Sequence, residues 1–136
     1  MSINLFIPAA GLGSRLRPLT HLLPKPLLPL AGISVLERNI SAVSTALEID
    51  QIGINTHWLP DEINNWGKES QFKNSLHFFQ EDELLGTGGA LKNASALLEQ
   101  KSFLVFNGDV LMDIDWAALL EQHRREGNLV TLAVQD

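Results

Sequence analysis

The chain of 136 residues contains no cysteine, and its 10 Lys and Arg are outnumbered by 16 Asp and Glu. Without cysteine it can form neither disulfides nor thiolate metal sites, which fits a reducing compartment. The net charge of −6 argues against a general affinity for nucleic acid or for an acidic membrane surface. These absences exclude disulfide scaffolds and disfavour nucleic-acid-binding proteins.

Long apolar runs are also absent. No stretch approaches the roughly 18 residues that a membrane-spanning helix requires. The N-terminus has no basic region, and Pro8 breaks its only apolar run, so it does not resemble a signal peptide. We therefore expect a soluble, cytoplasmic protein with no membrane partner.

The charges are distributed unevenly along the chain. Residues 1–36 contain Arg15, Arg17 and Lys25 and no acidic residue, so this segment carries +3. The other hundred residues hold seven Lys or Arg and all sixteen acids, which gives −9. An acidic protein with one acid-free basic segment is typical of a chain that attracts a small anion locally.

The length fits a single domain, and a hydrophobic content of 45 % is enough for an ordinary core. Short apolar runs, typical of strands buried on both faces, alternate with segments of helical spacing. This alternation predicts an α/β fold of the Rossmann-like, three-layer type, with a mostly parallel twisted sheet and helices on both faces. Strands are predicted at residues 3–7, 51–55, 76–80, 103–106 and 129–134, and helices at 35–47, from Pro60, at 90–98 and from Asp115 to about residue 125.

Helix caps and loops follow from the same pattern. Ser34 is predicted to cap the first helix, with Glu37 placed as in a capping box, and Asp115 to cap the last helix. Ligands of parallel sheets bind at the carboxyl ends of the strands. The loops at 9–32 and 107–109 are therefore expected to face the same crevice.

The strongest candidate site lies in residues 8–32. Gly11 and Gly13 let backbone amides approach a ligand closely, and Arg15 offers a bidentate fork for phosphate oxygens. Lys25 lies between two prolines, which restrict the backbone and so aim its ammonium group. Together these features predict a site for a polyphosphate.

Two common nucleotide-binding patterns do not fit this stretch. The dinucleotide fingerprint needs a third glycine where Leu16 stands, and the second strand ends in Asn55 rather than in the acid that holds a ribose. The phosphate-loop pattern fails because no Gly-Lys-Ser/Thr is present. A nicotinamide-dependent dehydrogenase is therefore disfavoured, and a cradle for a nucleoside triphosphate (NTP) remains.

The motif from Gly11 to Thr20, followed by Pro24-Lys25-Pro26-Leu27 and Pro29-x-x-Gly32, resembles the signature of the sugar-phosphate nucleotidyltransferases, or nucleotide-sugar pyrophosphorylases. Residues 85–91 (LGTGGAL) resemble the family's base-side loop, and Asn107-Gly108-Asp109 follows an apolar strand. The resemblance runs from about residue 3 to residue 135, and Ser34 departs from the family's usual proline. The variant motifs are most similar to the branch that acts on mannose-, heptose- or N-acetylmuramate-type 1-phosphates with GTP or UTP.

The resemblance implies an enzyme that transfers a nucleotidyl group from an NTP to a sugar 1-phosphate with Mg²⁺, releasing pyrophosphate. A non-catalytic NTP-binding or regulatory module is the alternative. By motif, Arg15, Lys25 and Asp109 would be catalytic, with Asp109 as the metal ligand. The resemblance assigns substrate binding to Ala10, Gly11, Gly13, Ser14, Arg15, Lys25, Gly88 and Asn107.

The family's catalytic domain is longer than this chain, and its later part supplies a second metal-binding aspartate and most of the sugar pocket. We therefore expect residues 1–136 to be the N-terminal, nucleotide-binding part of such a domain, truncated after a strand. Truncation would expose a sheet edge, and such edges can pair copies into a homo-oligomer.

Several other polar residues have simpler explanations. Asp115 is better explained as a helix cap than as a metal ligand beside Asp113. His57 follows a strand end, where a hydrogen-bonded loop histidine is expected. The acids at 81–83 could accept hydrogen bonds from a base edge, but a solvated acidic loop is the default expectation.

Overall fold

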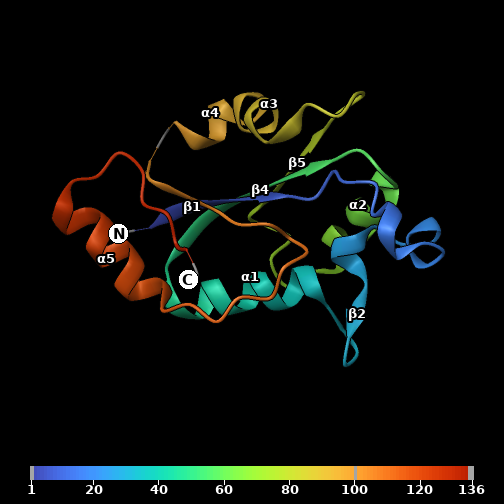
Figure 1. The fold of residues 1–136 in the computed structure, drawn as a ribbon, viewed down its shortest axis with the longest axis horizontal. Helices are drawn as coiled ribbons and strands as arrows, with labels where there is room; N and C mark the ends of the chain where they lie inside the picture. Colours follow the sequence, from blue (N-terminus) through green and yellow to red (C-terminus); the bar gives the residue numbers. More distant parts are fainter. Residues whose placement is uncertain (1, 100, 135–136) are drawn as a thin grey trace.

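The computed structural model describes residues 2–99 and 101–134 and has a central sheet between two layers of helices (Figure 1). The sheet contains four parallel strands in the order β5-β4-β1-β6. Its parallel pairing confirms the predicted sheet type. The strands are β1 (Ile3–Pro8), β4 (Ile49–Thr56), β5 (Leu76–Gln80) and β6 (Phe103–Val105).

Helices cover both faces of this sheet, as predicted. The helices α1 (Val35–Ala46), α2 (Pro60–Glu69) and α5 (Trp116–Glu126) lie on one face, and α3 (Gly86–Asn93) and α4 (Ser95–Leu98) lie on the other (Figure 1). None of the helices in the described ranges is long and apolar enough to span a membrane. The long loop after β1 contains the short 3₁₀ helices η1 (Ser14–Leu16), η2 (Leu19–His21) and η3 (Lys25–Leu27), and leads into a hairpin of β2 (Pro29–Leu30) and β3 (Ile33–Ser34).

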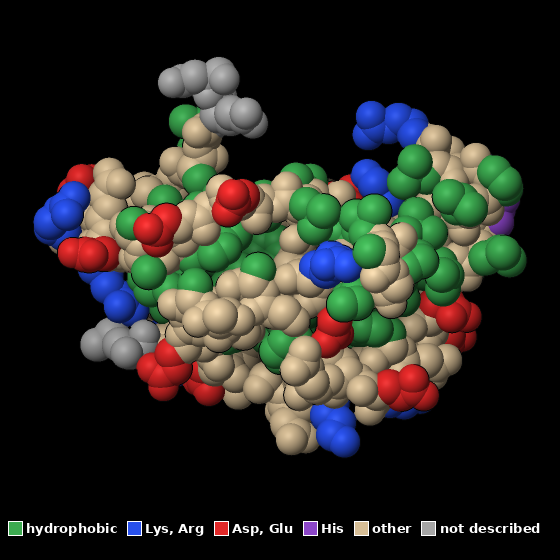
Figure 2. All heavy atoms as spheres, turned by 90° about the horizontal axis from the view of Figure 1, so that it is seen from below, with side chains coloured by type: hydrophobic (Ala, Val, Ile, Leu, Met, Phe, Trp, Pro, Cys, Tyr) green, Lys and Arg blue, Asp and Glu red, His purple; other side chains and the backbone are tan. Residues whose placement is uncertain are grey.

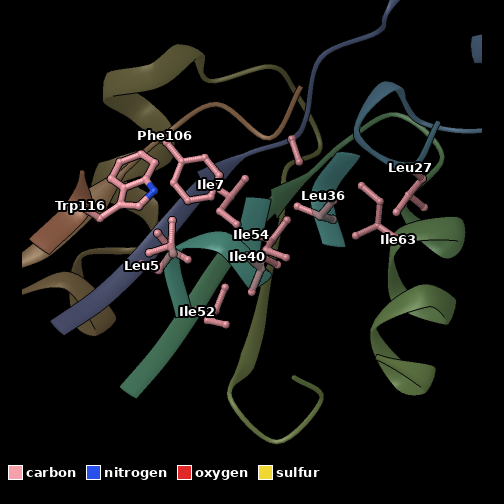
Figure 3. Packing of buried hydrophobic residues seen from close by; sticks show 12 residues of the cluster. Leu5, Ile7, Leu27, Leu36, Ile40, Ile52, Ile54, Ile63, Phe106 and Trp116 are labelled. Atoms are coloured by element: carbon pink, nitrogen blue, oxygen red, sulfur yellow. The ribbon is translucent and has the colours of Figure 1, made fainter. Parts of the chain in front are cut away.

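The alternation of side chains along β1 produces a core on each face of the sheet. Leu5 and Ile7 pack on the side of α1, whereas Phe6 packs against α3 and α4. All three side chains are fully buried, which stabilises the fold by about 1.5–3 kcal/mol for each. Figure 3 shows Ile7 beside Ile40 of α1 and Ile54 of β4, so the larger core lies between the sheet and α1.

Both predicted helix caps are confirmed. The Ser34 hydroxyl accepts a hydrogen bond from the Glu37 amide at 3.1 Å, and an Asp115 carboxylate oxygen accepts from the Ala118 amide at 2.9 Å. Each cap satisfies one of the amides that the first turn of a helix leaves without a partner. The assignment of Asp115 to a structural role therefore holds.

Two predicted elements are wrong. The single helix expected at 90–98 is two helices, because α3 already begins at Gly86 and the helical geometry is interrupted at Ala94, where α3 ends and α4 begins. Residues 129–134 form no strand. A strand needs a hydrogen-bonding neighbour, and in the part of the chain that the structure describes no strand pairs with these residues.

Exposed apolar side chains gather in two places. Figure 2 views the face covered by α1 and α5, and green side chains cluster at its right end, where the loop after β1 lies. The second place is a groove of about 470 Å³ lined by β6, α5 and residues 129–132. Leu129 is 99 % exposed there, so the run that was expected to be a buried strand adds nothing to the core.

Candidate functional site

A cleft of about 450 Å³ opens where the parallel strands end. Its lining includes Ala9 directly after β1, Asn55 near the end of β4, Glu81 directly after β5 and Asn107 shortly after β6. The loop after β1 provides much of the remaining lining. The prediction that the loops at 9–32 and 107–109 share one crevice is therefore confirmed.

The structure brings eight of the nine predicted site residues into this cleft. The ninth, Gly88, is exposed in the first turn of α3, whereas its neighbours Gly86 and Thr87 line the cleft. This placement shows that the residues lie together, while their individual roles stay predictions. The eight lining residues are Ala10, Gly11, Gly13, Ser14, Arg15, Lys25, Asn107 and Asp109.

The loop after β1 turns sharply at Gly13. Its φ of +61° lies in the left-handed region that favours glycine, and a Cβ here would lie 2.7 Å from Cγ2 of Thr20. Thr20 is fully buried, and its hydroxyl donates to the Gly13 carbonyl at 2.7 Å. The indole of Trp58 donates to the Thr20 carbonyl at 2.7 Å, so this tryptophan also fixes the loop.

The same turn leaves backbone donors free. Within the described ranges, no hydrogen bond engages the amides of Ala10, Gly11 or Gly13. Successive unpaired amides in a loop with a left-handed residue form a concave surface suited to anions. This surface is the part of the cleft that best fits phosphate oxygens.

Replacing Gly13 by alanine is expected to lower the free energy of unfolding by about 1–3 kcal/mol, because alanine is strained at positive φ. The added Cβ would also collide with the side chain of Thr20. Urea unfolding followed by circular dichroism measures the effect. Gly11→Ala is the matched control, since a Cβ at Gly11 meets no atom within 4 Å. Equal stability of the two variants would contradict this account of the turn.

A cation and a carboxylate from distant parts of the sequence meet inside the cleft. Nζ of Lys25 lies 2.6 Å from Oδ2 of Asp109, and their side chains are 32 % and 31 % exposed. A ligand can therefore reach both groups. Ion pairs this accessible contribute at most about 1 kcal/mol to stability, so a phosphate group can compete for the ammonium.

The position of Asp109 follows from how its neighbours pack. The Gly108 amide donates to the Pro8 carbonyl at 3.4 Å, and a Cβ on Gly108 would lie only 2.8 Å from Ile7 Cγ2. The segment therefore stays against β1. Beyond it, Nδ2 of the Asn39 side chain in α1 donates to the Val110 carbonyl at 2.8 Å, which fixes the chain on the other side of Asp109.

The charges in the cleft are more balanced than the acid-free segment predicts. Arg15 and Lys25 face a lining that also contains Glu81 and Asp109. The fold thus brings two carboxylates to the basic loop from beyond residue 36. An anion would be attracted by specific donors rather than by a general positive charge.

Sequence reasoning missed the importance of Asn55 and Glu81. The expectation of a solvated acid is wrong for Glu81, which is only 4 % exposed, although Asp82 and Glu83 are exposed. Its carboxylate accepts a hydrogen bond from Nδ2 of the Asn55 side chain at 2.8 Å. His57 is a hydrogen-bonded loop histidine, as expected, with Nδ1 at 2.8 Å from the Glu81 carbonyl. The sequence signal that could have identified Asn55 and Glu81 is a polar residue at the end of each of two apolar strands.

Comparison with known proteins places this cleft in a family. A family model described as nucleotidyl transferase matches residues 6–136. The mannose-1-phosphate guanylyltransferase of Mycobacterium tuberculosis is 36 % identical over 131 residues, which cover 96 % of this chain and 36 % of that protein. The human mannose-1-phosphate guanylyltransferase regulatory subunit alpha is 33 % identical over 120 residues, or 84 % of this chain and 29 % of that protein.

Solved structures show the same architecture. HddC from Yersinia pseudotuberculosis, complexed with GMP-PN, has a TM-score of 0.76 and 31 % identity, covering 89 % of this chain and 54 % of that one. UDP-glucose pyrophosphorylase complexed with UDP-glucose has a TM-score of 0.76 at 19 % identity, a likeness that shows the fold alone. The chain spans about a third of the curated relatives' length and about half of the similar solved chains.

Proposed function

The chain belongs to the nucleotidyl transferase family, and on that premise we propose that it forms the nucleotide-binding half of a sugar-1-phosphate nucleotidyltransferase. The observation that carries the proposal is the meeting of Lys25 and Asp109 at 2.6 Å, beside a loop with unpaired amides. A cation, a carboxylate and free amides are the groups that an NTP with a metal requires.

In the proposed reaction an oxygen of the sugar 1-phosphate attacks the α-phosphorus of the NTP, the bond to the β-phosphate breaks, and pyrophosphate leaves. No covalent enzyme intermediate is needed, so the protein contributes positioning and charge neutralisation. The loop amides and Arg15 would bind the triphosphate, and Lys25 would neutralise charge near the α-phosphate. Asn107 would contact the ribose or the sugar phosphate.

The proposed base is guanine, held against the turn at residues 86–88. The similarity to a mannose-1-phosphate guanylyltransferase and to a protein complexed with GMP-PN supports GTP ahead of UTP. The same relative supports a mannose-type 1-phosphate as the acceptor. Gly86 and Thr87, which line the cleft, would approach the base more closely than Gly88.

The residues that line the cleft fit Mg²⁺ if one carboxylate holds the ion together with substrate phosphates. Magnesium is usually held by one or two carboxylates together with substrate phosphates and water. Among the described residues, no group of three or more His, Cys, Asp or Glu could hold a metal alone. Asp109 would therefore be the protein ligand and the phosphates would complete the site. When bound, the ion would neutralise charge on the phosphates.

Gly11→Ala is expected to weaken the binding of Mg·GTP by about tenfold, because a methyl group would keep a phosphate from the loop amides. The fold should be unaffected, since a Cβ there meets no atom within 4 Å. Isothermal titration calorimetry on this chain measures the affinity. Unchanged affinity would show that the phosphates do not bind at this loop.

A non-catalytic nucleotide-binding subunit is the second candidate, and the similarity to the human regulatory subunit alpha favours it. Pyrophosphate release separates the two functions. The whole protein is titrated with GTP and with UTP, with and without Mg²⁺, and then supplied with mannose 1-phosphate or another sugar 1-phosphate. Metal-dependent binding with pyrophosphate release supports the transferase, and binding without release supports the subunit. If neither NTP binds, both proposals fail.

A cytoplasmic location is part of the same proposal. The absence of cysteine supports a reducing compartment, where NTPs are also available. Fractionation of cells followed by detection of the protein would test it.

A further inference from the structure

Two hydrogen bonds in series hold the turn at Gly13. The Thr20 hydroxyl donates to the Gly13 carbonyl at 2.7 Å, and the indole Nε1 of Trp58 donates to the Thr20 carbonyl at 2.7 Å. Thr20 is fully buried, and Trp58 lies between β4 and α2, so neither residue is part of the cleft lining. The loop after β1 is therefore fastened to a separate part of the fold.

The first of these bonds fixes the orientation of the peptide unit between Gly13 and Ser14. In a trans peptide the carbonyl and the amide that follows it point in opposite directions. Because the Gly13 carbonyl points toward the buried Thr20, the Ser14 amide points away from it, and Ser14 lines the cleft. Within the described ranges, no hydrogen bond engages the Ser14 amide. This amide can therefore act as a further donor to a ligand in the cleft.

The glycine in this turn also makes the peptide unit easy to reverse. Gly13 has a φ of +61° and a ψ of 27°, and a residue without a Cβ reaches many other conformations at little steric cost. A reversed unit would direct a carbonyl oxygen at the cleft, where it would repel phosphate. The Leu16 amide also donates to the Gly13 carbonyl at 3.0 Å, but a single bond of a short 3₁₀ turn constrains the unit weakly.

The backbone beside Trp58 is strained. Leu59, the N-cap residue of α2, has a φ of +48°, in the left-handed region that is unfavourable for residues with a Cβ. Such conformations persist only where the surrounding structure enforces them, and they gather near functional sites. Here the strained residue belongs to the turn that presents the indole to Thr20.

We propose that Thr20 and Trp58 are positioning residues that keep the Ser14 amide directed at the phosphates of a bound nucleotide. This inference rests on the proposed function. Thr20 holds the peptide unit, and Trp58 holds Thr20. A donor that already faces the ligand needs no reordering, whereas a donor that turns round lowers the affinity by the fraction of molecules in which it faces away.

Calorimetric titration of this chain with Mg·GTP and with Mg·pyrophosphate tests the role of the hydroxyl. Thr20→Val keeps the shape of the side chain and removes the donor. It is expected to weaken the binding of both ligands by about five- to tenfold, the usual worth of one hydrogen bond. Thr20→Ser keeps the hydroxyl and removes only a methyl group, so it should bind both ligands within about twofold of the wild type.

Trp58→Phe tests the second bond, because it keeps an aromatic ring and removes the indole donor. It is expected to weaken the binding of both ligands by about three- to fivefold. The double variant Thr20→Val/Trp58→Phe should bind no more weakly than Thr20→Val, because two bonds in series share one effect. Trp66→Phe, the same change at a tryptophan of α2 that packs against the larger core, is the matched control and should bind as the wild type does.

Nuclear Overhauser effects provide a readout that needs no ligand. The effect between the α-protons of Gly13 and the Ser14 amide proton depends on ψ of Gly13, which changes when the peptide unit reverses. It should strengthen in Thr20→Val, as reversed units become populated, and return to the wild-type value in Thr20→Ser.

Three results would overturn the positioning role alone. They are unchanged affinities in Thr20→Val, equal weakening in Thr20→Val and Thr20→Ser, and an additive loss in the double variant. If Thr20→Val does not fold, Trp58→Phe decides, and affinities equal to those of Trp66→Phe overturn the role. A wild-type chain that binds neither ligand overturns the proposed function and the positioning role with it.

Discussion

Replacing Lys25 by methionine is expected to weaken the binding of Mg·GTP to this chain by about 10- to 100-fold, the usual worth of a charge-assisted hydrogen bond. In the whole protein, turnover should fall by about 10²- to 10³-fold, as for the loss of one donor to a developing charge. Methionine keeps the length of the stem and removes only the ammonium. Calorimetry measures the first effect, and pyrophosphate release measures the second.

The fold should tolerate this change. Lys25 and Asp109 are about one-third exposed, so the lost ion pair should lower the free energy of unfolding by less than about 1 kcal/mol. Lys73→Met, at an exposed lysine outside the cleft lining, is the matched control and should affect neither binding nor turnover. If the loss of binding parallels a loss of stability, Lys25 supports the fold and does not contact the nucleotide.

Replacing Asp109 by asparagine is expected to change nucleotide affinity in opposite directions with and without metal. Without Mg²⁺, GTP should bind about three- to tenfold more tightly, because the carboxylate no longer holds Lys25 or repels the phosphates. With Mg²⁺, GTP should bind more weakly and turnover of the whole protein should fall by about 10²- to 10³-fold, because the proposed metal ligand is weakened. Titrations in EDTA and in excess Mg²⁺ measure the two affinities, and pyrophosphate release measures the turnover.

Asp113→Asn is the control for this experiment. Asp113 lies four residues further along the chain and is not part of the cleft lining, so its replacement should leave both titrations unchanged. If Asp109→Asn weakens GTP binding in EDTA, the carboxylate does not compete for Lys25. If Mg²⁺ still increases affinity in the variant as it does in the wild type, Asp109 is not the metal ligand.

The layers of the fold could be predicted because each depends on local patterns. Apolar runs such as 76–80 and capping residues such as Ser34 determine strands and helix starts within a few residues. The strand predicted at 129–134 is wrong because strand formation does not depend on local patterns alone. Its composition favours a strand, but a strand also needs a neighbour, which the described part of the chain does not supply.

The part of the candidate site that one contiguous sequence motif forms could be predicted. Residues 10–15 and Lys25 lie in one loop, and the topology of a parallel sheet places Asp109 beside them. The burial of Glu81 was not predictable, because it depends on Asn55 from a neighbouring strand. The balance of charge in the cleft was missed for the same reason, since the carboxylates come from distant parts of the chain.

The central claim is that an NTP binds between the loop after β1 and the first turn of α3, beside Lys25 and Asp109. Amide chemical shifts of the isotopically labelled chain, recorded during a titration with Mg·GTP, test it directly. The account predicts that the largest changes occur at residues 10–15, 86–88 and 107–109. Changes confined to other surfaces, such as the apolar groove beside β6, or no changes at saturating GTP, would contradict it.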